Sequence, residues 1–181
     1  MTTLVLASRS PRTRALGVVV AAGALALAAQ FAMPIPGTPV PLTLQPLVVV
    51  LAGLLLGPAD AAAAMVLYLV AGAAGLPVFA PIGAPGLARL FGPTGGYLLA
   101  YPVAAAVAGR LGAGRAEFAT RAIAAMTGIL VIYLGGLTQL AVVTGSLASA
   151  AVLGVLPFVA ADAVKALVAA AVAGPRRRGV A

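Results

Sequence analysis

The chain has 181 residues, of which 63% are hydrophobic and only 8% are charged, and its mean hydropathy is +1.17. Because soluble domains average about 25% charged residues, this composition excludes a protein whose whole surface faces water. The absence of cysteine and histidine excludes disulfides, thiolate or imidazole metal sites and catalysis by these side chains. With only three acidic residues in total, we expect no catalytic site and no metal site.

Six apolar segments follow one another along the chain, at about 15–33, 42–56, 61–76, 94–109, 121–143 and 156–173. A helix needs about 20 residues to cross the hydrocarbon core, so the second, third and fourth segments are short and require an added turn or a locally thinned bilayer. Residues 144–155 favour a short extra helix before the last span. No abrupt change in composition marks a second domain. We therefore predict an all-α integral membrane protein, a single domain over 1–181 built as a bundle of six transmembrane helices.

The first segment has some features of a cleavable signal peptide, because a basic stretch precedes an apolar run that contains Ala26, Ala28 and Ala29. The run is long for a signal peptide, and cleavage would leave five spans with mismatched ends, so we expect the segment to be retained. It also contains Ala22-x-x-x-Ala26, a spacing that lets helices approach closely in lipid. Any alanine-rich helix shows such spacings by chance.

The eleven basic residues lie mostly in short clusters between the apolar segments. If the N-terminus is cytoplasmic, six spans place the clusters at 9–14, 110–121 and 176–178 on one side, as the positive-inside rule requires. The exceptions are Arg89, in an outer loop, and Lys165, within the last helix. No basic stripe is interleaved with aromatic residues, which argues against a nucleic-acid partner. We predict a multi-pass protein of the cytoplasmic membrane with both termini cytoplasmic.

Two external segments are rich in proline and glycine. The first, MPIPGTPVPLTLQ, has four prolines from Pro34 to Pro41 and favours an extended, stiff backbone. The second, GLPVFAPIGAPGLARLFGPTGGY, is predicted to be irregular, yet it carries apolar side chains such as Phe79 and Phe91. It could simply lie on the bilayer surface. We favour the interpretation that the external segments roof a substrate pocket.

Two charged residues, Asp162 and Lys165, interrupt the last apolar segment. Each alone costs roughly 2.5–3.5 kcal/mol at the centre of a membrane helix, and their i, i+3 spacing places both on one helix face. One interpretation is a buried ion pair with only a structural role. The other is that both line a polar cavity and bind a ligand with a donor edge and an anionic group, which is the interpretation that intramembrane charges favour.

Four stretches together resemble the BioY family, the biotin-binding membrane subunits of energy-coupling-factor (ECF) vitamin transporters: PIPGTPVPLTLQPLVVVLAGLLLG, LYLVAGAAGLPVFAP, FGPTGGYLLAY and PFVAADAVK. The resemblance runs from about residue 16 to 173. It implies a six-helix bundle with an external pocket for biotin, and no enzymatic activity. It also implies as partners a transmembrane coupling subunit, docked on the first helix at Ala22 and Ala26, and two ATPase subunits. The chain itself would need no cofactor, and it lacks the phosphate-binding motif GxxxxGK[ST].

The resemblance also implies the pocket residues. Asp162 would accept from the urea of biotin, and Lys165 would pair with the ligand carboxylate. The stretch after Phe79 departs from the glycine-rich pattern of the family, which makes Arg89 a second candidate for that carboxylate or a contact for lipid headgroups. The complete predicted set is Thr43, Gln45, Phe79, Arg89, Phe91, Thr94, Gly95, Gly96, Tyr97, Asp162 and Lys165.

Three alternative functions remain open. A subunit of the same architecture for riboflavin, thiamin or a queuosine-type precursor would need aromatic stacking surface, and the chain has no tryptophan. An integral membrane enzyme would need a second carboxylate, a histidine or a cysteine near Asp162 and Lys165. A structural or assembly protein would leave Lys165 and the proline-rich segment without an evident use.

Overall fold

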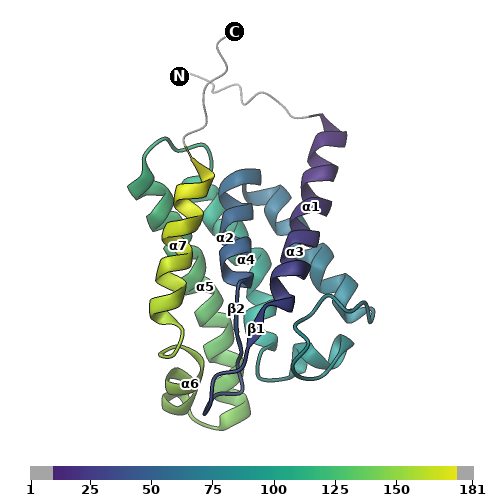
Figure 1. Cartoon of the computed structure of the whole chain (residues 1–181), viewed down its shortest axis with the longest axis vertical. Coiled ribbons are helices and arrows are strands. Elements are labelled where there is room, and N and C mark those ends of the chain that lie inside the picture. Colours follow the sequence, from purple (N-terminus) through teal and green to yellow (C-terminus); the bar gives the residue numbers. More distant parts are fainter. Residues whose placement is uncertain (1–9, 175–181) are drawn as a thin grey trace.

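The computed structural model describes residues 10–174, which form a helical bundle with two longer loops at one end (Figure 1). The bundle contains seven α-helices, α1 (Pro11–Gln30), α2 (Gln45–Leu56), α3 (Pro58–Ala73), α4 (Gly95–Gly112), α5 (Phe118–Thr144), α6 (Leu147–Gly154) and α7 (Val159–Ala173). The prediction of an all-α fold is confirmed. The basic residues at 9 and 176–178 lie outside the described residues.

The two external segments contain structure that the sequence did not predict. In the first, strands β1 (Ala32–Met33) and β2 (Leu42–Thr43) pair antiparallel, so α1 ends three residues before its predicted end at 33. In the second, which was predicted to be irregular, Gly86–Phe91 form the 3-10 helix η1. Residues 87–91 contain neither glycine nor proline, so this part of the segment can form a helical turn.

The exterior of the bundle suits lipid. Among the described residues, α1 and α5 are long and apolar enough to cross a membrane alone, and α6 with α7 passes the same test as a pair bent by 57°. The apolar helices α2 and α3 have only 12 and 16 residues, in line with the short segments expected there. Large apolar side chains are exposed on the outside of nearly every helix, and such a surface is stable in a bilayer because helices satisfy their own backbone hydrogen bonds. The chain is a helical membrane protein.

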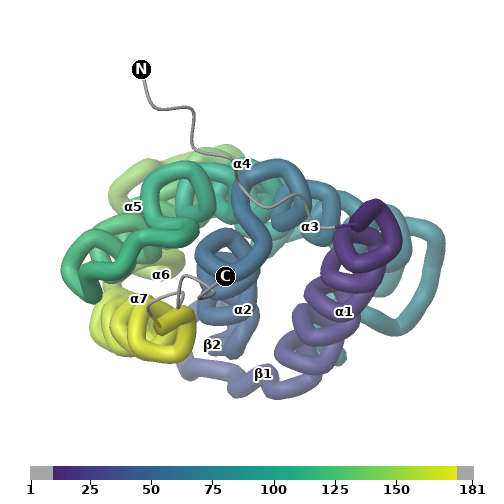
Figure 2. The backbone as a smooth tube through the Cα atoms, turned by 90° about the horizontal axis from the view of Figure 1, so that it is seen from above, coloured from purple at the N-terminus to yellow at the C-terminus, as the bar shows by residue number. Residues whose placement is uncertain are grey.

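The core is built largely from small residues. Helix α4 packs along α5, α2 and α3, whereas α1 lies against α3 and α2, and α7 lies against α2 and α5 (Figure 2). At the crossing of α4 and α5, a Cβ atom added to Gly135 would lie 2.5 Å from the backbone oxygen of Gly96. Glycine at this position therefore lets the two backbones meet, which is how membrane helices gain packing energy in lipid.

The start of α1, the end of α7 and the α4–α5 loop lie at one end of the bundle, opposite the β1–β2 hairpin, η1 and α6 (Figure 1). At that first end Arg14 forms a two-pronged ion pair with Asp60 of α3, with Nη2–Oδ1 at 2.7 Å. Arg121, expected at the boundary between the cytoplasmic loop and the fifth span, is a buried residue of α5. Its Nε donates to the carbonyl of Ala170 at 2.9 Å, so this arginine caps the last turn of α7.

Gly135→Ala is expected to lower the melting temperature of the detergent-purified protein, because overpacking a tight contact costs about 1–3 kcal/mol. Gly23→Ala on α1 is the matched control, since nothing lies within 4 Å of a Cβ atom there. Alanine at that position should preserve or slightly raise stability. If Gly135→Ala melts at the wild-type temperature, the close packing of α4 on α5 is not needed for stability.

Candidate functional site

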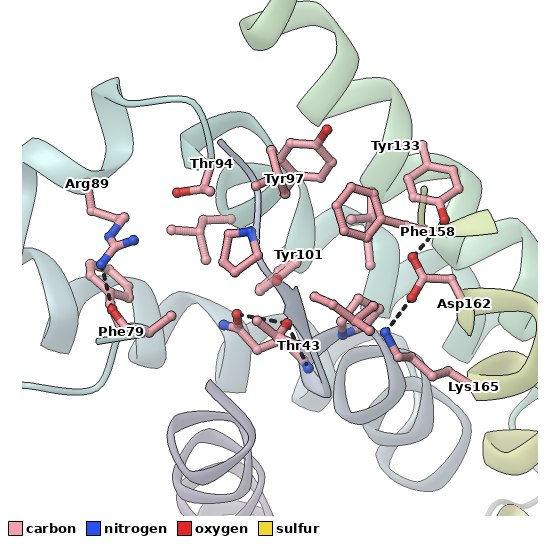
Figure 3. Close-up of a pocket in the computed structure, with 18 residues that line it drawn as sticks. Thr43, Phe79, Arg89, Thr94, Tyr97, Tyr101, Tyr133, Phe158, Asp162 and Lys165 are labelled. Carbon is pink, nitrogen blue, oxygen red and sulfur yellow. Dashed lines mark hydrogen bonds and ion pairs between the residues drawn. The ribbon is translucent and has the colours of Figure 1, made fainter. Parts of the chain in front are cut away.

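A small cavity lies at the hairpin end of the bundle, between β2, η1 and the helices α4, α5 and α7 (Figure 3). Its volume is about 60 Å³, which is room for a few water molecules and far below the roughly 300–1,000 Å³ of ordinary ligand pockets. In this structure the cavity is therefore closed to a ligand of ordinary size. The polar residues that line the cavity are Thr43, Gln45, Arg89, Thr94, Tyr97, Tyr101, Tyr133, Asp162 and Lys165.

Most of the predicted site residues meet in this cavity. Eight of them line it, namely Thr43, Gln45, Phe79, Arg89, Thr94, Tyr97, Asp162 and Lys165. Phe91 does not, because its side chain is 76% exposed on the outside of the loop. Gly95 and Gly96 also lie outside the lining; an added Cβ atom would overlap the carbonyl of Leu90 or of Gly135. The two glycines thus allow close packing of the α4 start rather than forming the cavity wall.

One end of the cavity holds the two charges of α7. Lys165 Nζ lies 2.6 Å from Asp162 Oδ1, and the two residues are only 8% and 3% exposed. Tyr133 on α5 donates to the other carboxylate oxygen, Oδ2, at 2.7 Å. Each oxygen therefore has one protein donor and one remaining lone-pair direction. This end can accept hydrogen bonds from a ligand while its two charges cancel.

The opposite end of the cavity holds a cation that has no acidic partner within the described residues (Figure 3). Arg89 is only 6% exposed, and its terminal nitrogens donate to the carbonyls of Ala80 and Ile82. Among residues 10–174, its Nε is the one buried side-chain nitrogen or oxygen that lacks a hydrogen-bond partner. Burial lowers the pKa of the guanidinium from its ordinary value, yet arginine remains charged. A buried cation with a free donor is suited to a ligand anion.

The floor of the cavity is a hydrogen-bonded layer. Gln45 Nε2 donates to the hydroxyl of Tyr68 at 2.8 Å, and the Thr43 hydroxyl donates to Gln45 Oε1 at 3.3 Å. The rings of Tyr68 and Phe79 pack edge to face with centroids 5.3 Å apart. Gln45 therefore supports β2 and the floor, and its side-chain amide is already engaged.

Side chains from the bundle hold the two external segments over the cavity. The Thr38 hydroxyl donates to the carbonyl of Leu153 at 2.6 Å, which ties the first segment to α6. Gln139 Nε2 on α5 donates to the carbonyls of Leu90 and Gly92 at 2.9 and 2.7 Å, which ties down the second. These hydrogen bonds attach the two external segments to α5 and α6.

The contributors to the site that the predicted set lacks include three aromatic residues of the lining, Tyr101, Tyr133 and Phe158, and Gln139, which holds the second external segment. Tyr133 and Gln139 are polar-tipped residues within a long apolar helix, and that feature is a usable signal in the sequence. Which of them face inward depends on the rotation of α5, which its apolar pattern does not define.

The predicted docking pair on α1 faces the bundle. Ala22 is 8% exposed within the core, and Ala26 is partly buried against the same cluster. The exposed side of this helix is formed by larger residues, including Leu16, Val20 and Leu27. The alanines that follow residue 20 lie on the inner side of α1, whereas its exposed face carries the larger residues, so the difference in side-chain size distinguishes the two faces.

Removing one member of the ion pair should destabilise the protein more than removing both. Lys165→Met leaves a buried, uncompensated carboxylate, whereas Asp162→Asn with Lys165→Met leaves none; the first situation typically costs about 3–5 kcal/mol. We expect the double variant to melt at a higher temperature than Lys165→Met when both are measured without ligand. Equal melting temperatures would mean that the carboxylate is solvated or protonated rather than held by Lys165.

The amino-acid sequence is similar to those of one known protein family. The model of the BioY family matches residues 3–181. The chain is 47% identical over 135 residues to the probable biotin transporter BioY of Pyrococcus horikoshii, covering 75% of this chain and 79% of that protein. It is 38% identical over 139 residues to the biotin transporter BioY of Thermotoga maritima, covering 77% and 82%.

A solved structure shares the fold. The crystal structure of an S-component for biotin from an ECF-type ABC transporter superposes with a TM-score of 0.80, covering 92% of this chain and 93% of that one. The two sequences are 20% identical, so this likeness bears on the arrangement of the helices alone.

Proposed function

This chain belongs to the BioY family, and we propose that it binds biotin and serves in its uptake as the substrate-specific subunit of an ECF-type transporter. It is a transport protein and not an enzyme. The observation that carries the proposal is the order of groups along the closed cavity. The neutral pair of Asp162 and Lys165 lies at one end, aromatic and aliphatic walls follow, and the cation Arg89, which has no acidic partner in the described part of the chain, lies at the other. Biotin presents a urea, an apolar thioether ring and a carboxylate in the same order.

The geometry supports a ligand orientation different from the one expected from the sequence. Lys165 and Asp162 are in direct contact at 2.6 Å, whereas the ring system and the valerate chain separate the urea of biotin from its carboxylate. The two ends of the ligand therefore cannot both be held by this pair. We place the urea N–H groups on Asp162 and the carboxylate on Arg89, whose charge has no acidic partner among residues 10–174.

The closed cavity requires the roof to move. A volume of about 60 Å³ excludes a vitamin of this size, so the segments at 34–41 and 79–92 act as lids that open for the ligand. Two neighbouring cavities, of about 390 and 170 Å³, share wall residues with the central one. Lys165 belongs to the wall toward the larger cavity and Arg89 to the wall toward the smaller. Small shifts of these walls enlarge the site.

The membrane orientation and the partners follow the same proposal. The end of the bundle that carries Arg110 and Arg115 faces the cytoplasm, in keeping with the positive-inside rule, and both chain termini lie on that side of the cytoplasmic membrane. A transmembrane coupling subunit docks on α1 and carries two ATPase subunits, and this chain holds no cofactor. Because Ala22 and Ala26 face inward, docking uses the outer face of α1 or follows a shift of this helix.

Purified protein is expected to bind biotin with one site per chain in isothermal titration calorimetry. Riboflavin and thiamin should give no comparable heat, since neither vitamin carries a carboxylate for Arg89 and thiamin is itself a cation. Tighter binding of either control vitamin would assign the subunit to that vitamin instead.

Arg89→Gln should weaken biotin about 10- to 150-fold, the effect of losing one charge-assisted contact. It should change the affinity of the neutral biotin amide much less. Asp162→Asn should lower the affinities for biotin and for biotin amide by the same factor, because both ligands keep the urea. Arg110→Gln, at the exposed end of α4, is the matched control and should change neither. If Lys165→Met, rather than Arg89→Gln, lowers the affinity for biotin much more than that for biotin amide, the carboxylate lies at Lys165.

A further inference from the structure

All four tyrosines of the chain surround the site, and three of their hydroxyls are engaged with protein groups. The hydroxyl of Tyr68 accepts from Gln45 at 2.8 Å. That of Tyr97 donates to the carbonyl of Gly154 at 2.8 Å, and that of Tyr133 donates to Asp162 at 2.7 Å. The exception is Tyr101, whose hydroxyl makes no hydrogen bond with any described residue although the side chain is only 3% exposed.

The free hydroxyl of Tyr101 faces the cavity. The residue lines the cavity, and its oxygen is not among the fully enclosed polar atoms that lack a partner. Buried polar groups in native proteins nearly always have a partner, from the protein or from water. The partner of Tyr101 must therefore come from the cavity itself, as water in the closed state and as ligand in the bound state.

The donors that remain free in the cavity indicate which ligand atom Tyr101 meets. In Figure 3 it lies between the end marked by Arg89 and the end marked by Asp162 and Lys165. A urea bound to Asp162 through N–H also carries a carbonyl oxygen, and burying that acceptor without a donor is unfavourable. The hydroxyls of Tyr97 and Tyr133 already donate to protein groups, whereas that of Tyr101 has no partner among residues 10–174.

We propose that Tyr101 is a specificity residue that donates a hydrogen bond to the urea carbonyl oxygen of the ligand. This inference rests on the proposed function. Lys165 keeps N–H groups that Asp162 does not use, and a carbonyl oxygen has two lone pairs, so Tyr101 and Lys165 hold the same oxygen from two sides. The site thereby recognises a cyclic urea by its acceptor as well as by its donors, and it discriminates against ring systems that lack a strong carbonyl acceptor.

The test compares biotin with 2-thiobiotin, in which sulfur, a weak acceptor, replaces the urea oxygen. Tyr101→Phe should weaken biotin about 3- to 10-fold, the effect of one neutral hydrogen bond. It should change the affinity for 2-thiobiotin less than about twofold. Binding of both compounds is measured by calorimetry on purified protein, together with the melting temperature without ligand.

Tyr97→Phe is the matched control, because it removes the same atom one helical turn earlier on α4. The hydroxyl of Tyr97 holds the end of α6 through Gly154, so this variant should shift both affinities by a common factor and lower the melting temperature. Tyr101→Phe overturns the inference if it leaves biotin binding unchanged, or if it weakens biotin and 2-thiobiotin equally. Failure of the wild-type protein to bind either compound would instead remove the proposed function, and the inference with it.

Discussion

The organisation of this protein depends on one ion pair inside the membrane domain, between Lys165 and Asp162 at 2.6 Å. Either charge alone would oppose insertion of α7 into the bilayer. Together, with Tyr133 on the second carboxylate oxygen, they form a neutral and hydrogen-bonded unit that the bundle can enclose. The pair therefore requires α7 to turn this face inward, against α5 and α2. It also creates a polar end for the cavity without leaving a net charge there.

The small residues of the other helices make that enclosure possible. Glycine and alanine along α4 and α5 bring the backbones together, which closes the bundle at its centre. Toward the hairpin end, tyrosines and the external loops replace the small residues, and the cavity lies between them. The net charge of the site then comes from Arg89, which is held by loop carbonyls. A neutral pair and an isolated cation at opposite ends make the site asymmetric, and this asymmetry orients an amphiphilic anion.

Much of this architecture follows from the sequence, because long apolar runs, proline and intramembrane charges act locally. The helical segments, the short extra helix before the last span and the meeting of most predicted site residues in one cavity follow from such signals and from the family resemblance. Other features depend on long-range contacts. The β1–β2 pairing joins segments ten residues apart, and the burial of Arg121 depends on a carbonyl partner on α7. The inward orientation of Ala22, by contrast, has a local signal, because the larger residues Leu16, Val20 and Leu27 occupy the opposite face of α1.

The central claim is that the two ends of the cavity hold the two polar ends of biotin. The most direct measurement is an experimental structure of the protein with biotin bound, at a resolution that distinguishes the thioether sulfur from the carboxylate. We predict the urea beside Asp162, with its oxygen facing Tyr101 and Lys165, and the carboxylate within hydrogen-bonding distance of Arg89 Nε. A ligand bound in the reverse orientation, or seated in either neighbouring cavity, would contradict this account.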